Sequence, residues 1–277
     1  PFLCLCVILA VTGCQGLSLF DDPRSVARGI AAEHGFQARY LQAGQFTLLS
    51  FFRAGGDGGS SPLVVYIGGD GDAWKNRFVL ARDPTPRDPQ TLKLAVQEPA
   101  PNVVFLARPC QYTTPATARG CHPRYWAHGR YAEEVIEAIS LAIDRYKAMV
   151  GAGEVELVGF SGGGTVAALI AARRPDIVGL TTVASNLDHA AWTAHHDLTP
   201  LRGSLNPADF AHQLEAVPQV HLAGEDDDVV PPAIIESYIG RMADHSRTRL
   251  IVMSDFGHDC CWSRLWRQLR AHYGFDS

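Results

Sequence analysis

The sequence lacks an excess of positive charge. Its 277 residues contain 24 Lys and Arg against 29 Asp and Glu, which gives a formal net charge of −5 at pH 7. Because binding to nucleic-acid phosphates needs a basic face, we expect no nucleic-acid partner. The chain also has no internal repeat, low-complexity segment or linker-like stretch. We therefore expect one large domain over residues 17–277 rather than two small ones.

The sequence has no apolar run long enough to span a bilayer, which takes about 20 residues. The shorter run Phe2 to Val11 suits the apolar core of a signal peptide over residues 1–13. Val11-Thr12-Gly13-Cys14 resembles the lipobox of bacterial lipoprotein signals, which implies cleavage before Cys14 and lipidation of that cysteine. Gln15, rather than an aspartate, follows Cys14, and by this resemblance favours the outer membrane.

We therefore expect an exported lipoprotein on the periplasmic face of a bacterial membrane, held by an N-terminal lipid anchor. The alternatives for the same residues are an ordinary signal peptide and a buried apolar strand with an incidental cysteine.

Cysteines are few, and export would place them in an oxidising compartment. Apart from Cys4, Cys6 and the candidate lipidation site Cys14, the cysteines are Cys110, Cys121, Cys260 and Cys261. Four cysteines allow three pairings, between which the sequence alone does not choose. Cys110 and Cys121 bracket a loop rich in Thr, Pro and Arg, so we favour a local disulfide there. Cys260 and Cys261 would then be a vicinal pair or two thiols.

Continuous apolar runs alternate with helical patterns along the chain. The expected strands are Gln45–Arg53, Pro62–Ile67, Asn102–Leu106, Val155–Val158, Ile177–Ala184, Gln219–Ala223 and Thr248–Met253. The expected helices are Arg24–His34, Gln90–Gln97, Arg130–Val150, Thr165–Ala172, Pro231–Met242 and Cys261–Tyr273. Gly55–Ser61 is expected to form a hairpin-like turn. Continuous rather than alternating apolar strands indicate burial on both faces, which predicts an α/β fold with a mostly parallel, three-layer sheet.

Gly159-Phe160-Ser161-Gly162-Gly163 lies between an expected strand and a helix of small residues. This is the G-x-S-x-G pattern of a nucleophile elbow, in which a sharp turn exposes the serine hydroxyl. The pattern alone is weak, because chance would place one in about one chain in eight of this glycine content. A serine nucleophile also needs a base and an orienting acid.

Two later loops offer those partners. Gly224–Pro232, with the sequence GEDDDVVPP, and Ser254–Cys260, with the sequence SDFGHDC, each follow an expected strand. The acids could simply favour the start of a helix, and a loop histidine is often structural. Both loops nevertheless lie at the carboxyl ends of parallel strands, where ligands bind in such sheets.

The chain resembles the α/β-hydrolase family over Leu63 to Tyr273. The resemblance rests on GFSGG around Ser161, GEDDDVVP around Asp227 and FGHD around His258, in that order. It implies a catalytic triad of Ser161, Asp227 and His258. The acid of this family stands three residues after the glycine of its turn, which selects Asp227. The flanking acids, Asp226 and Asp228, remain alternatives.

Gly68-Gly69-Asp70 stands where many relatives have His-Gly-X. The resemblance implies an oxyanion hole formed by the backbone amide of Asp70 or Gly69 and by that of Gly162. Taken alone, this glycine cluster could equally be a plain tight turn.

The stretch from about residue 186 to residue 217 resembles a small cap insertion over the site. It contains His189 and His196, which lie seven residues apart without a matching acid, so we expect no metal. Trp74 and Arg124-Tyr125-Trp126 could line the same pocket, although packing in the core is an equal alternative for each.

Together these features predict a serine hydrolase, a carboxylic-ester hydrolase that works through an acyl-enzyme and without a cofactor. Its partner would be a small-molecule or acyl-ester substrate. The alternatives are an acyltransferase, a thioesterase or a peptidase on the same fold, or a non-catalytic, lipid-anchored binding protein. The sequence leaves the substrate and the oligomeric state open.

Overall fold

The computed structural model describes residues 22–275, except for residues 57 and 77. The expected signal peptide and the candidate lipidation site, Cys14, lie outside the described residues.

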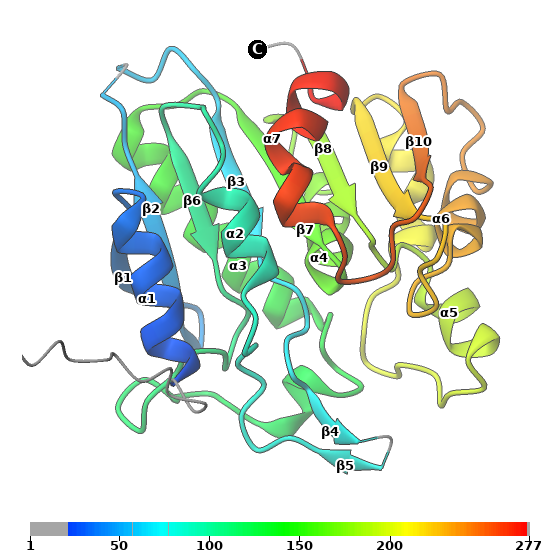
Figure 1. The fold of residues 1–277 in the computed structure, drawn as a ribbon, viewed down its shortest axis with the longest axis horizontal. Coiled ribbons are helices and arrows are strands. Elements are labelled where there is room, and N and C mark those ends of the chain that lie inside the picture. The colour runs from blue at the N-terminus through cyan, green and yellow to red at the C-terminus, as the bar shows by residue number, and fades with distance from the viewer. Residues whose placement is uncertain (1–21, 57, 77, 276–277) are drawn as a thin grey trace, which may run out of the picture.

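An eight-stranded sheet forms the centre of the molecule (Figure 1). Its strand order is β1-β2-β6-β3-β7-β8-β9-β10. The strands are β1 (Gln37–Ala43), β2 (Phe46–Arg53), β6 (Val103–Leu106), β3 (Leu63–Ile67), β7 (Val155–Phe160), β8 (Ile177–Val183), β9 (Gln219–Gly224) and β10 (Thr248–Met253). β2 is antiparallel to both of its neighbours, and the other pairings are parallel. This confirms the predicted fold class.

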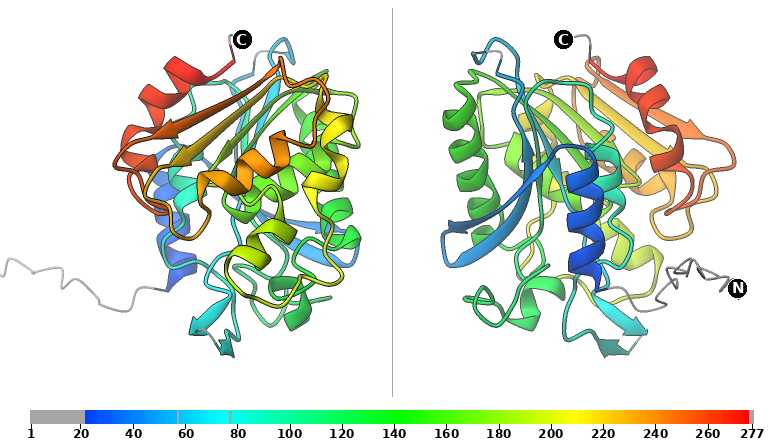
Figure 2. Two further views of the ribbon diagram at one scale, coloured as in Figure 1. Left: turned by 90° about the vertical axis from the view of Figure 1, so that its right-hand side faces the viewer. Right: turned by 60° about the vertical axis from the view of Figure 1, so that its left-hand side comes forward.

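Helices cover both faces of the sheet (Figure 2). One face carries α1 (Pro23–Glu33), α2 (Gln90–Ala95) and α7 (Trp262–Tyr273); the other carries α3 (Glu133–Val150), α4 (Gly162–Ala171) and α6 (Pro232–Ile239). None of the helices within the described residues has both the length and the hydropathy to cross a bilayer.

Strand β3 shows why its sequence is apolar without interruption. Leu63, Val65 and Ile67 belong to the core under α3 and α4. Val64 and Tyr66 point to the other face and belong to the core under α2 and α7. Since successive side chains of a strand alternate between faces, a sheet covered on both sides needs apolar residues at every position.

Two features differ from the expectation. First, β1 pairs with β2 in a hairpin. By contrast, Gly55–Ser61 does not form the expected hairpin turn, because it connects β2 to β3 and these two strands are separated in the sheet by β6. β1 was not predicted, because it lies at the edge and most of its residues are exposed or only half-buried. A second, small hairpin of β4 (Trp74–Asn76) and β5 (Val79–Leu80) also lacked a sequence signal.

Candidate active site

Ser161 occupies a sharp turn between β7 and α4. Its φ of +52° is in a region that residues with a side chain rarely adopt, and such a conformation costs on the order of 1–3 kcal/mol. The Ser161 amide donates to the carbonyl oxygen of Val183 at 2.9 Å, which ties the turn to β8. A Cβ added to Gly163 would overlap the carbonyl oxygen of Ile67 on β3. The turn therefore depends on glycine to bring its backbone this close to the sheet.

The structure brings Ser161, His258 and Asp227 into one line of hydrogen bonds. Nε2 of His258 lies 3.1 Å from Oγ of Ser161, and Nδ1 lies 2.9 Å from Oδ2 of Asp227. The loop after β10 carries His258 and the loop after β9 carries Asp227. These are the distances at which a base can take the serine proton and an acid can orient the base.

The local hydrogen bonds distinguish Asp227 from the two acids beside it. Its other oxygen, Oδ1, accepts the backbone amides of Val229 at 2.9 Å and Val230 at 2.7 Å. The Asp227 side chain is buried, whereas Asp226 and Asp228 are exposed. Asp227 is therefore the acid of this loop that contacts His258.

Two backbone segments meet beside the Ser161 hydroxyl. Gly162 is the first residue of α4, whose first amides have no partner within the helix. The loop after β3 approaches from the other side, with Gly69 packed against Phe160 and Ser161. In the part of the chain that the structure describes, the amides of Gly162, Asp70 and Gly69 donate to no protein acceptor, so both alternatives for the second donor stay open.

The Asp70 side chain forms a cluster that the sequence did not suggest. Its carboxylate pairs with Arg108 at 3.2 Å and Arg130 at 2.9 Å, and accepts the hydroxyl of Tyr131 at 2.9 Å. Burial by itself raises the pKa of Asp70, but the two guanidinium groups and these hydrogen bonds outweigh it and hold the pKa below 3.8. Arg108 also donates to the carbonyl oxygen of Gly162 at 3.2 Å, so the cluster joins both backbone segments.

Arg108 had one signal in the sequence. It stands two residues after Leu106, the last residue of β6, and so at the carboxyl end of a parallel strand, where ligand sites form. Arg130 had none: the sequence placed it in the expected helix Arg130–Val150, whereas α3 begins only at Glu133, and Arg130 reaches Asp70 only through the tertiary fold.

A disulfide-closed loop supports the segment after β3. Cys110 and Cys121 are joined, with their Cα atoms 5.4 Å apart, as the spacing suggested. Gln111, next to Cys110, donates through Nε2 to the carbonyl oxygen of Gly69 at 2.9 Å. Cys260 and Cys261 are joined as a vicinal disulfide directly after the His258 loop.

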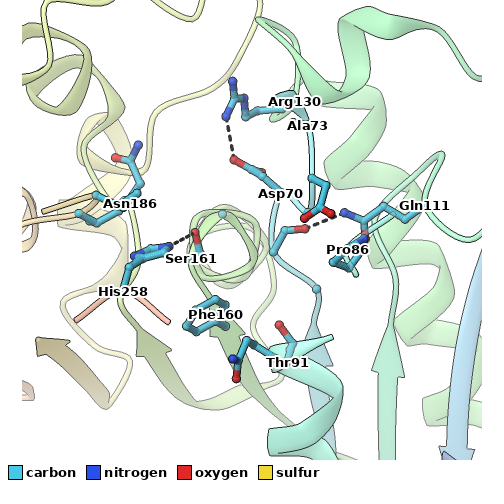
Figure 3. Close-up of a pocket in the computed structure, with 18 of the residues that line it drawn as sticks. Asp70, Ala73, Pro86, Thr91, Gln111, Arg130, Phe160, Ser161, Asn186 and His258 are labelled. Atoms are coloured by element: carbon cyan, nitrogen blue, oxygen red, sulfur yellow. Dashed lines mark hydrogen bonds and ion pairs between the residues drawn. The ribbon is translucent and has the colours of Figure 1, made fainter. Parts of the chain in front are cut away.

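A cavity of about 710 Å³ opens onto Ser161 and His258 (Figure 3). The expected cap segment contributes Trp192, Leu198 and Leu201 to its wall. Further lining side chains are Trp74, Pro86, Thr91, Phe105, Gln111, Tyr112, Arg130, Phe160, Asn186 and Val229. The wall also includes the acids Asp70, Asp72, Asp88 and Asp259, but its surface is more apolar than polar, so the cavity suits an apolar group beside the reactive serine.

The other aromatic candidates lie elsewhere. Tyr125 and Trp126 are buried in the core under α3, and Nε1 of Trp126 donates to the carbonyl oxygen of Ala81 at 2.9 Å. The alternative of core packing is therefore correct for these two, whereas Trp74 does line the cavity.

The cap histidines have structural contacts. They lie on or just after α5 (His189–His195), and His196 approaches the carbonyl oxygen of Val229 through Nε2 at 2.9 Å. Burial lowers the pKa of His189. Across residues 22–275, leaving aside 57 and 77, no three His, Cys, Asp or Glu side chains gather as they would around a metal.

Comparison with known proteins reveals similarity in structure alone. No protein-family model matches the chain, and no curated protein matches its sequence. An α/β serine hydrolase homologue from Coxiella burnetii superimposes with a TM-score of 0.59 and 16% identity, over 86% of this chain and 95% of the other. A membrane phospholipase A, described as a bacterial virulence factor, gives a TM-score of 0.56 and 17% identity, over 90% and 87%.

The esterase domain of a Rhodothermus marinus protein gives a TM-score of 0.58 and 12% identity, over 86% of this chain and 96% of the domain. The strand order and these superpositions define the fold of this chain as that of the α/β-hydrolases.

Proposed function

We propose that this chain is a serine hydrolase that cleaves carboxylic esters. The observation that carries the proposal is the hydrogen-bonded line from Asp227 through His258 to Ser161, which ends at an apolar cavity. The structural relatives include an esterase domain and a phospholipase A, which agrees with ester chemistry on this fold.

In the proposed reaction, Oγ of Ser161 attacks the acyl carbon while Nε2 of His258 takes its proton. Asp227 accepts a hydrogen bond from the Nδ1–H of His258, which keeps that proton on Nδ1 and leaves Nε2 available as the base. The tetrahedral intermediate collapses to an acyl-enzyme, and His258 returns the proton to the leaving alcohol. A water molecule, deprotonated by His258, then releases the acid and restores Ser161.

The oxyanion of the intermediate would accept the amides of Gly162 and Asp70. One such donor is typically worth about 3–4 kcal/mol of transition-state stabilisation. Arg108 and Arg130 carry two positive charges and Asp70 one negative charge, so the nearby cluster has a net charge of +1. This charge favours a developing oxyanion, and more strongly so in a partly buried site.

Labelling with a fluorophosphonate probe tests the nucleophile. We expect a covalent adduct on the parent chain and none on Ser161→Ala. Ser254→Ala is a matched control, because Ser254 is an exposed serine before the His258 loop, and it should label as the parent does. An adduct of equal yield on folded Ser161→Ala would refute the proposal.

Product analysis separates esterases from the other acyl-transfer enzymes that could use the same site. Alcohol, thiol and amine acceptors, offered with a common acyl donor, would reveal an acyltransferase. Thioester and peptide substrates would reveal a thioesterase or a peptidase. Ester hydrolysis that survives Ser161→Ala would instead favour a non-catalytic binding role for this chain.

We also propose that Cys14 carries a lipid that anchors the exported chain to a bacterial membrane, with the outer membrane favoured. The support is the lipobox-like Val11-Thr12-Gly13-Cys14 after an apolar run. Metabolic labelling with a fatty acid should mark the parent chain and not Cys14→Ser. Equal labelling of both would overturn this assignment.

A further inference from the structure

The β4–β5 hairpin has an unusual composition for this chain. Residues 74–82 read WKNRFVLAR, with three basic residues and no acidic one, in a protein whose formal net charge is −5. The same nine residues include Trp74, Phe78, Val79 and Leu80. Aromatic and basic side chains together are typical of segments that lie at a membrane–water interface.

The hairpin presents three of these four apolar side chains to solvent, whereas Leu80 is half-buried against the core. Phe78 is 85% exposed, Val79 47% and Trp74 46%. The hairpin projects from the end of the molecule towards which the parallel strands point (Figures 1 and 2). Single exposed apolar residues are common on protein surfaces, but a cluster of this kind marks an interaction site.

The exposed apolar surface continues around the mouth of the cavity. Leu198 is 40% exposed and Val229 41% exposed, and both line the cavity, as does Trp74. Phe78 and Val79 extend this rim along the hairpin. The described residues include eight large exposed apolar side chains. Five of the eight lie in this patch, namely Trp74, Phe78, Val79, Leu198 and Val229, so exposed apolar surface is concentrated at the site rather than scattered.

The hairpin is held rigidly at its base. The amide of Ala81 donates to the carbonyl oxygen of Ala73 at 2.9 Å, and both alanines are buried. Trp126, in the core, donates to the carbonyl oxygen of Ala81. A fixed base lets the tip present its side chains without a large loss of conformational entropy on binding.

The charges of the hairpin are complementary to an anionic surface, although the cavity mouth also carries two exposed acids, Asp228 beside Val229 and Asp259 in the cavity wall. Among the described residues, the acids next to the hairpin are compensated: Asp83 pairs with Arg24, Asp88 pairs with Lys93 at 2.5 Å, and Asp72 lies 3.9 Å from Arg87. None of these three pairs involves Lys75 or Arg82, the two basic residues of the hairpin that the structure describes.

Lys75 and Arg82 are exposed and take part in no ion pair within the described part of the chain. Basic side chains beside an apolar tip can contact lipid headgroups while the tip enters the acyl boundary.

The N-terminal segment leaves the described fold at the same end. Helix α1 begins at Pro23, and Arg24 donates to the carbonyl oxygen of Thr113 at 2.9 Å and pairs with Asp83, close to the hairpin base. An attachment through the residues before Asp22 would therefore start from the hairpin end of the molecule.

We propose that Trp74, Lys75, Phe78, Val79 and Arg82, here called the docking hairpin, bind the surface of an anionic lipid bilayer. Leu198 and Val229 form the part of this surface at the cavity mouth. Docking places the opening of the cavity against the membrane. Given the proposed esterase function, on which this last consequence alone rests, esters that reside in the membrane reach Ser161 directly.

Vesicle binding tests the apolar part of the docking hairpin. Every protein is the full chain with Cys14→Ser, so that no lipid is attached and the N-terminal segment contributes equally throughout. On vesicles of phosphatidylcholine and phosphatidylglycerol, Phe78→Ser/Val79→Ser should lower the partition coefficient about tenfold. The matched control is Leu141→Ser/Met149→Ser, because both residues are 46% exposed on α3, away from the hairpin. It should bind as the parent does.

The charged part is tested with Lys75→Gln/Arg82→Gln. Binding to the anionic vesicles should fall about tenfold and binding to pure phosphatidylcholine should not change, because only the anionic surface attracts these side chains. Raised salt should reduce the difference between the parent and this variant.

Quenching of tryptophan fluorescence by brominated lipid gives a second, local measurement. The parent should be quenched on vesicles, and Trp74→Phe should lose that component. Because neither measurement requires turnover, an inactive protein that binds in this way would refute the esterase proposal and leave the docking surface intact.

Three results would overturn the proposal. The first is equal vesicle binding by Phe78→Ser/Val79→Ser and the parent. The second is an equal loss of binding in the α3 control. The third is a concentration-dependent dimer that Phe78→Ser/Val79→Ser abolishes, which would assign this surface to a second copy of the chain.

Discussion

The two backbone segments beside the Ser161 hydroxyl are held in place by different means. On the nucleophile side, glycines let the turn between β7 and α4 pack directly on β3, and the main chain itself defines the position of Ser161. On the other side, the loop after β3 is held by side chains that come from distant parts of the sequence. Asp70 pairs with Arg108 and Arg130, and Gln111 holds Gly69.

The two segments are therefore sensitive to different kinds of substitution. A backbone-defined turn tolerates no added atom, because its contacts are with main-chain groups that cannot move aside. A loop held by side chains can lose one contact and keep its course, and each contact contributes a limited share. Four substitutions or conditions test this contrast, and they are given in decreasing order of effect.

Gly163→Ala should have the largest effect. The added Cβ would overlap the carbonyl oxygen of Ile67, so the turn must shift or β3 must distort. We expect a loss of about 3 kcal/mol in the free energy of unfolding and a fall of about 10³-fold in kcat/KM. Gly153→Ala is the control, since its Cβ meets no atom within 4 Å. Full activity in Gly163→Ala would contradict the backbone-defined half of the comparison.

Asp70→Asn keeps the backbone amide but leaves two buried guanidinium groups without their carboxylate. We expect a loss of about 3 kcal/mol in stability, measured by urea unfolding, and a fall of about 10²-fold in kcat with a smaller change in KM. Asp72→Asn, an exposed acid two residues later, should change stability by less than about 0.5 kcal/mol. An increase in kcat would show that the charge of Asp70 opposes the reaction more than its contacts help.

Gln111→Ala removes one neutral hydrogen bond from the loop, that to the carbonyl oxygen of Gly69. We expect about a tenfold fall in kcat/KM and a loss of about 1 kcal/mol in stability. Gln45→Ala removes a side-chain hydrogen bond to the hydroxyl of Tyr125, in the core under α3 and α4, and should leave the kinetics unchanged. Equal activities of the two variants would show that Gln111 does not position the loop.

The pH dependence of stability gives the smallest effect. Since the pKa of Asp70 is lower in the folded protein than its usual 3.8, its pairing stabilises the fold above that pH. This contribution is lost as the pH falls through the folded pKa, below about pH 4. The free energy of unfolding, measured in urea, should fall more for the parent than for Asp70→Asn when the pH is lowered from 5 to about 3. Parallel curves would exclude this linkage.

Most of the fold could be predicted from local patterns because the central strands, such as β3, β6, β7 and β9, are buried on both faces. Val64 and Tyr66 had to be as apolar as their neighbours, since a second layer of helices covers them. The same reasoning failed at β1, whose side chains are mostly exposed or half-buried and carry no such signal. The small β4–β5 hairpin was not predicted for the same reason, because most of its side chains are exposed.

The sequence by itself determined the order of Ser161, Asp227 and His258 and the strands that precede them, because turns and strands depend on neighbouring residues. Tertiary structure decided that these three side chains meet at hydrogen-bond distances and that Asp227, rather than Asp226 or Asp228, is the buried one. It alone decided the partners of Asp70, which lie 38 and 60 residues away along the chain. Such pairs depend on how the sheet brings loop ends together, and no local pattern encodes that meeting.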